Sequence, residues 1–89
     1  MALARIKLPV GLVGADGPRE LECDGVIVGE ALQDCVAKDP RLKPRIFREG
    51  GGVWVGIFVN GRNIRSIDGM DTVLRDGDEI RLMPPIAGG

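Results

Sequence analysis

The sequence contains no histidine and no tyrosine, and it has one serine, Ser66, and one threonine, Thr72. Nucleophilic catalysis by a serine or cysteine requires a base beside the nucleophile, most often a histidine. The chain therefore lacks the parts for an acyl-transfer site of its own. We expect a protein that is not an enzyme and has no catalytic residues.

The two cysteines, Cys23 and Cys35, match no common zinc spacing without a histidine. Each falls on the apolar face of its own predicted element, so we expect reduced, buried thiols. No run approaches the roughly 18 apolar residues of a membrane span, and Pro9 and Gly11 interrupt the short apolar stretch near the N-terminus. These patterns predict a cytoplasmic protein with no bound metal and no membrane association.

A large excess of charge of one sign is also missing, because 12 basic and 13 acidic residues leave a net charge of −1. Only three aromatic residues are present, so neither a basic groove nor a stacking platform for nucleic acid is expected. The glycines at 50–52 lack the Lys and Ser or Thr of a phosphate-binding loop and precede a predicted strand. With 89 residues, the chain is long enough for one domain with a modest core.

Hydrophobic periodicity predicts a hairpin followed by a helix. Apolar residues alternate over 6–12 and again over 19–24, on either side of a turn-rich stretch at 14–18. From Val28 they recur every three or four residues, which predicts a helix that ends near Asp39 because Pro40 follows.

The second half predicts further strands. We expect a loop over 39–52, a strand over 53–59, a tight hairpin turn at 60–61 and a short strand around Ile64. Because side chains alternate between the two faces of a strand, a last strand should place Ile80 and Leu82 inward. Arg81 and Met83 should then point outward. The order predicts an α+β fold, a mixed sheet with one main helix on one face, and a right-handed parallel connection through that helix from the second strand to the third.

The domain should span residues 1–83, and residues 84–89, "PPIAGG", should form a flexible tail. Its unusual chemical group is the carboxylate of Gly89, which becomes an acylating agent only after activation, for example as an acyl adenylate. Pro84 and Pro85 favour an extended start that holds the tail off the domain. Ile86 could dock the tail, and Ala87 and Gly88 present little bulk in a narrow channel.

Several stretches resemble the ubiquitin-like sulfur-carrier family called ThiS/MoaD: "VGEAL" at 28–32, "VNG" at 59–61, "DGDEI" at 76–80 and the "PPIAGG" end. The resemblance implies a β-grasp fold and a Gly89 that an ATP-using enzyme of the ubiquitin-activating type adenylates. A sulfur donor then yields a thiocarboxylate, and a biosynthetic enzyme accepts the sulfur. The chain itself would bind no cofactor. Destinations in this family include molybdopterin, thiazole, cysteine or another sulfur metabolite, and thiolated tRNA.

Partner-binding residues are expected on the open sheet face, where Trp54, Phe58 and Met83 would form an apolar strip beside the tail with Arg81 at its rim. The alternative is that Trp54 or Phe58 packs under the 39–52 loop as part of a small second core. Two other functions also remain open: a protein modifier joined to lysines through the same tail, and a ubiquitin-like interaction module, such as a subunit of a larger enzyme, whose tail is incidental.

Overall fold

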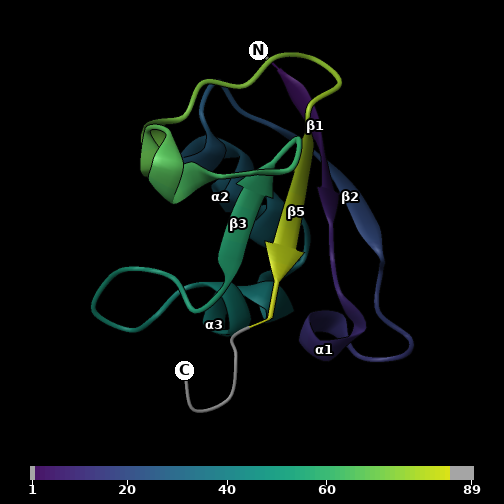
Figure 1. Ribbon diagram of the computed structural model, residues 1–89. Coiled ribbons are helices and arrows are strands. Elements are labelled where there is room, and N and C mark those ends of the chain that lie inside the picture. Colours follow the sequence, from purple (N-terminus) through teal and green to yellow (C-terminus); the bar gives the residue numbers. More distant parts are fainter. Residues whose placement is uncertain (1, 85–89) are drawn as a thin grey trace.

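A five-stranded mixed sheet organises the molecule. The computed structural model describes residues 2–84. The strands are β1 (Leu3–Lys7), β2 (Glu20–Asp24), β3 (Gly56–Val59), β4 (Arg62–Asn63) and β5 (Glu79–Met83), in the spatial order β2-β1-β5-β3-β4 (Figure 1). The β1–β5 pair is parallel and the other pairs are antiparallel. The first and last strands therefore lie side by side at the centre of the sheet.

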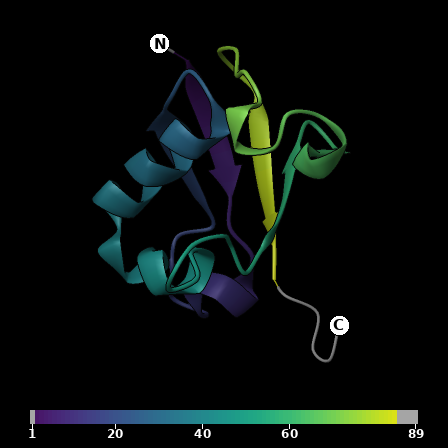
Figure 2. The same cartoon turned by 90° about the vertical axis from the view of Figure 1, so that its left-hand side faces the viewer.

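The main helix, α2 (Val28–Lys38), lies against one face of this sheet (Figure 2). Its first amide, that of Val28, donates to the carbonyl of Thr72 at 3.0 Å. Helical geometry stops at Asp39, as the following Pro40 predicts. The prediction of one helix on one sheet face is confirmed. The strands that α2 connects, β2 and β3, run parallel to each other, but β1 and β5 lie between them.

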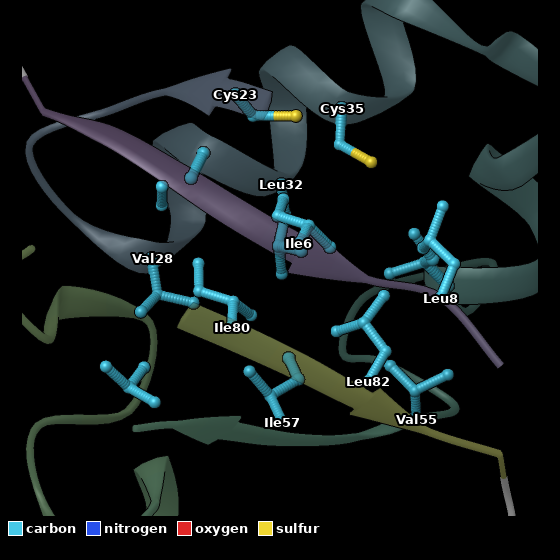
Figure 3. Close-up of a cluster of buried hydrophobic side chains, with 14 of the residues drawn as sticks. Ile6, Leu8, Cys23, Val28, Leu32, Cys35, Val55, Ile57, Ile80 and Leu82 are labelled. Atoms are coloured by element: carbon cyan, nitrogen blue, oxygen red, sulfur yellow. The ribbon is translucent and has the colours of Figure 1, made fainter. Parts of the chain in front are cut away.

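The core lies between α2 and the sheet. Alternate residues of β1, β3 and β5 point toward the helix, and α2 contributes Val28, Ala31, Leu32 and Cys35, all fully buried (Figure 3). The inward positions of Ile80 and Leu82 are as predicted. Burial of each large aliphatic side chain contributes about 1.5 to 3 kcal/mol to folding. Among residues 2–84, no helix covers the other face of the sheet (Figure 2).

Cys23 and Cys35 are both free and buried, which confirms that they do not form a disulfide in this structure. They face one another from β2 and α2 (Figure 3). The hydrogen bond to Cys23, together with burial, raises the pKa of Cys35. The Cys35 thiol is therefore protonated at neutral pH and serves as a small core side chain.

The first strand lies earlier in the chain than predicted: it spans Leu3–Lys7, whereas the alternation predicts 6–12. β1 ends at Lys7, and residues Val10–Val13 form a short helix, α1, that begins after Pro9. The amides of Leu12 and Val13 both donate to the Pro9 carbonyl, at 2.9 and 3.2 Å. Proline has no amide to donate to a strand neighbour, so the chain turns here instead of continuing the ladder. The β1–β2 hairpin itself is confirmed.

Half of the predicted 39–52 loop is helical. A 3₁₀ turn spans Pro40–Leu42 and leads into α3 (Lys43–Ile46). Leu42 and Ile46 are buried, so this segment closes one end of the core. The sequence did not indicate these two helices, because polar residues interrupt the apolar pattern and proline usually marks the end of a helix. Here each proline occupies a first-turn position, where helices tolerate it.

Two strand boundaries also differ from the prediction. The third strand begins at Gly56, three residues later than expected, because Val53 pairs with Phe47 instead and makes only an isolated bridge. Ile64 is buried in a 3₁₀ turn, Ile64–Ser66, after the two-residue β4. The hairpin turn is as predicted, since Asn60 and Gly61 both have positive φ, 49° and 86°. A further 3₁₀ turn, Gly69–Asp71, precedes the last strand.

No helix described within residues 2–84 has the length and apolar character required to cross a bilayer.

Candidate docking face and tail base

The described chain ends where the predicted tail begins. β5 stops at Met83, and Pro84 is the last described residue. A Cβ added to Gly11 of α1 would lie 3.9 Å from the Cβ of Pro84, so α1 flanks the start of the tail. The other residues predicted to thread or react lie outside the described residues: Pro85, Ile86, Ala87, Gly88 and Gly89.

The open sheet face brings three predicted partner-binding residues together. Phe58 of β3 lies directly opposite Arg81 of β5, and Met83 lies opposite Gly56. Gly56 has no side chain, and a Cβ there would be 3.5 Å from Phe58 Cε1 and 3.6 Å from Met83 Cβ. The Phe58 ring and Met83 therefore border the same bare stretch of backbone. Met83 is 45% exposed, so this apolar area is accessible beside the end of β5.

Charged residues continue the row across the sheet. Arg81 pairs in register with Lys7 of β1, and Lys7 pairs with Glu20 of β2. Lys7 and Glu20 form an ion pair, and the hydrogen bond from Lys7 lowers the pKa of the Glu20 carboxyl. Arg81 is 3.8 Å from Glu79 and remains more than half exposed. We call this face, formed by Phe58, Met83, Arg81, Lys7 and Glu20, the docking face, and we call Pro84 the tail base. The docking face has an apolar side next to the tail base and a charged side beyond it, as expected for an interface centre and its rim.

Trp54 lies outside β3 and beside α3. Its indole lines an open groove of about 410 Å³ together with Lys43, Pro44 and Phe47. Trp54 is 50% exposed, and the Arg48 guanidinium lies 5.0 Å from the centroid of its ring. The indole thus lies against the 39–52 segment without being enclosed in a second core, and the expected role of Trp54 in partner binding stays a prediction.

Residues 2–84 contain no group of three or more side chains suited to hold a metal ion. Within the same residues, no buried side-chain nitrogen or oxygen lacks a hydrogen-bond partner. Polar atoms are often left unpaired where a substrate or cofactor binds. Within residues 2–84, the candidate site therefore consists of an exposed sheet face and the start of the tail, without an unpaired buried polar side chain beside them.

Comparison with known protein families shows to which family this chain belongs. The model of the ThiS family matches residues 12–89, which include α2, Phe58, Arg81, Met83 and the Gly-Gly end. The chain belongs to the ThiS family. This is a family of sulfur carriers, proteins that serve as non-catalytic substrates of an activating enzyme, and membership confirms the resemblance drawn from the sequence.

Individual relatives agree with this assignment. A protein of Archaeoglobus fulgidus named as a candidate sulfur carrier is 38% identical over 63 residues, which cover 71% of this chain but only 61% of that protein. The solution structure of small archaeal modifier protein 1 from Methanosarcina acetivorans has a TM-score of 0.88 and 37% identity, covering 100% of this chain and 98% of that one. The CysO chain in the Amycolatopsis orientalis BexX/CysO complex has a TM-score of 0.81 and 25% identity, covering 97% and 99%.

These likenesses confirm the β-grasp, ubiquitin-like fold predicted from the sequence. Two features of the site were missed at the sequence level. Lys7 could have been included, because it occupies an outward position of its strand. The groove beside Trp54 could not, because its other wall is a helix in a segment that was predicted to be a loop.

Proposed function

We propose that this protein carries sulfur as a thiocarboxylate on Gly89 and delivers it to a biosynthetic enzyme. The observation that carries the proposal is the family match, which runs through the domain to the Gly-Gly end. The sequence has no histidine for a Ser-His or Cys-His nucleophile system, which agrees with a carrier whose chemistry is done by other proteins.

The proposed chemistry has two steps. A carboxylate oxygen of Gly89 attacks the α-phosphorus of ATP, which forms an acyl adenylate and releases pyrophosphate. The sulfur of a hydrosulfide-equivalent donor then attacks the carbonyl carbon, and AMP leaves with the oxygen it gained, so that one carboxylate oxygen is replaced by sulfur. The activating enzyme supplies the ATP site and aligns the reactants.

The tail residues are proposed to let Gly89 reach that site. Pro84 and Pro85 hold the departing chain extended, which lowers the entropy lost on entering a channel. Ile86 provides an apolar contact, and Ala87 and Gly88 add almost no width.

The acceptor pathway is proposed within the range known for carriers of this kind: molybdopterin, cysteine or another sulfur metabolite, thiazole, or thiolated tRNA. The likeness to CysO of Amycolatopsis orientalis, which was crystallised in a complex with BexX, supports direct binding to a partner protein. Affinity purification of the intact protein followed by identification of the tightest-bound partner would select among these pathways.

The sulfur-transfer proposal is tested by mass. After incubation with ATP, the cognate activating enzyme and a sulfur donor, the intact protein should gain about 16 Da, because one oxygen is exchanged for sulfur. The unreacted mass must correspond to a chain that ends at Gly89. Adenylate formation without any gain of sulfur would contradict the proposed carrier role.

The docking face makes a separate prediction. The substitution Phe58→Ala should raise the KM of the activating enzyme for the carrier roughly tenfold, because it removes an apolar anchor beside the tail base. The measurement is ATP–pyrophosphate exchange at several carrier concentrations. Gln33→Ala, on the exposed side of α2, is the control and should leave KM unchanged. An unchanged KM for the Phe58 variant would place the docking surface elsewhere.

A second function, protein modification, is favoured by the likeness to small archaeal modifier protein 1 of Methanosarcina acetivorans. The same adenylated Gly89 would then be attacked by a lysine amine, with AMP as the leaving group, to form an isopeptide bond. Adducts on cell proteins that persist under reducing conditions and that, after trypsin cleavage at Arg81, carry residues 82–89 on a lysine would establish it. Their absence, with thiocarboxylate present, would leave sulfur transfer alone.

A further inference from the structure

The groove beside Trp54 is held open by backbone contacts between two segments. α3 and Phe47 form one wall, and Trp54 forms the other. Phe47 and Val53 make an antiparallel bridge, and the Trp54 amide donates to the Ile46 carbonyl at 2.8 Å. The groove is therefore present before anything binds, which lowers the ordering cost of filling it.

Its surface is apolar and accessible. Phe47 packs on the core with one part of its ring, Pro44 is exposed, and Trp54 is half exposed. Tryptophan is the residue most typical of binding hot spots, and exposed apolar surface in a concave site is typical of docking sites. A volume of about 410 Å³ is enough for one or two apolar side chains.

The charges at the groove favour an anionic occupant. Lys43 and Arg48 line it, with Glu49 as the single acidic residue. Among residues 2–84, no ion pair involves Lys43 or Arg48, whereas the nearby Arg41 is paired with Asp39 at 2.9 Å. Arg48 is held over the indole face, so its charge lies at the apolar surface.

We propose that this groove docks a segment of a partner protein in which apolar side chains stand next to carboxylates. The apolar side chains would contact Trp54 and Phe47, and the carboxylates would pair with Lys43 and Arg48. The pairing of Gly56 with Met83 places the groove near the end of β5, so a partner that holds the tail base could reach both. The inference does not depend on whether Gly89 carries sulfur.

Trp54 provides the measurement, because it is the only tryptophan and the chain has no tyrosine. Two peptides serve as probes: acetyl-Ala-Asp-Leu-Phe-Asp-Ala-amide and the same peptide with both Asp replaced by Lys. Titrating the full-length protein with the acidic peptide should change Trp54 emission in a saturable manner, and added salt should weaken the binding. The basic peptide should bind more weakly.

A charge-reversed variant tests the assignment. Lys43→Glu combined with Arg48→Glu should weaken binding of the acidic peptide roughly tenfold and strengthen that of the basic one. Arg62→Glu, on β4 at the far end of β3, is the matched control and should bind like the unmodified protein. Because these side chains are exposed, unchanged circular dichroism should verify that the variants fold.

Three results would overturn the proposal. One is the lack of a saturable emission change with the acidic peptide, and another is equal affinity for the two peptides. The third concerns the protein's own tail: if removing residues 85–89 changes Trp54 emission without any peptide and tightens peptide binding, the tail occupies the groove.

Discussion

Removal of Gly88 and Gly89 is expected to abolish thiocarboxylate formation completely. The shortened chain would end at Ala87, so its carboxylate would sit two residues, or about 7 Å, short of the reacting position. Enzymes lose orders of magnitude in rate when reacting atoms are displaced by far less than this. The readout is the mass gain of sulfur after incubation with ATP, activating enzyme and donor.

The shortened protein should keep its fold, because the missing residues follow the last strand. Its urea midpoint should match that of the full chain, and it should still compete with the full chain for the activating enzyme through the docking face. Normal sulfur gain would contradict the role assigned to Gly89. Normal function of the shortened protein in cells without any sulfur gain would contradict both tail-based functions and establish an interaction module.

The substitution Leu32→Ala is expected to destabilise the domain by about 3 kcal/mol. Leu32 is fully buried on α2, in the same cluster as Ile6 and Ile80 (Figure 3). The change removes buried apolar surface and leaves a cavity that a single layer of core can only partly close. Since small domains are stable by roughly 5 to 15 kcal/mol, the loss is a large share of the total. Urea unfolding followed by circular dichroism measures it.

Gln33→Ala is the matched control, because Gln33 is adjacent in sequence but exposed on the same helix. It should change the free energy of unfolding by less than about 0.5 kcal/mol. A Leu32 variant as stable as the control would mean that α2 does not pack on the sheet as described.

The residues that face the core were predictable, because the spacing of apolar residues within one helix or one strand is a local property of the sequence. Val28, Ala31, Leu32 and Cys35 recur at helical spacing, and Ile80 and Leu82 alternate as in a strand with one buried face. The turn at Asn60 needs no tertiary information, because Asn and Gly accept positive φ more readily than other residues.

The predicted bounds of strands and loops were wrong where contacts made in the folded chain decide the outcome. Val53 has the residue type and phase of a strand, yet it pairs with Phe47 and not with β5. Leu42 and Ile46 look like scattered apolar residues in a polar loop until the open end of the core provides a place to bury them. The spacing of apolar residues does not show which end of the core would be exposed to solvent without a further segment packed on it.

The sequence by itself determined that a Ser-His or Cys-His catalytic system cannot be built from this chain, because it has no histidine. It also determined the main helix, the first hairpin, the last strand, the family resemblance and the Gly-Gly end, but not the short helices α1 and α3. Only the tertiary structure decided which residues meet: Phe58 beside Arg81, Lys7 in the same row, and Trp54 against α3. Alternation assigns a residue to a face, whereas strand order and register set its neighbours on that face, and these depend on pairing between segments far apart in the chain.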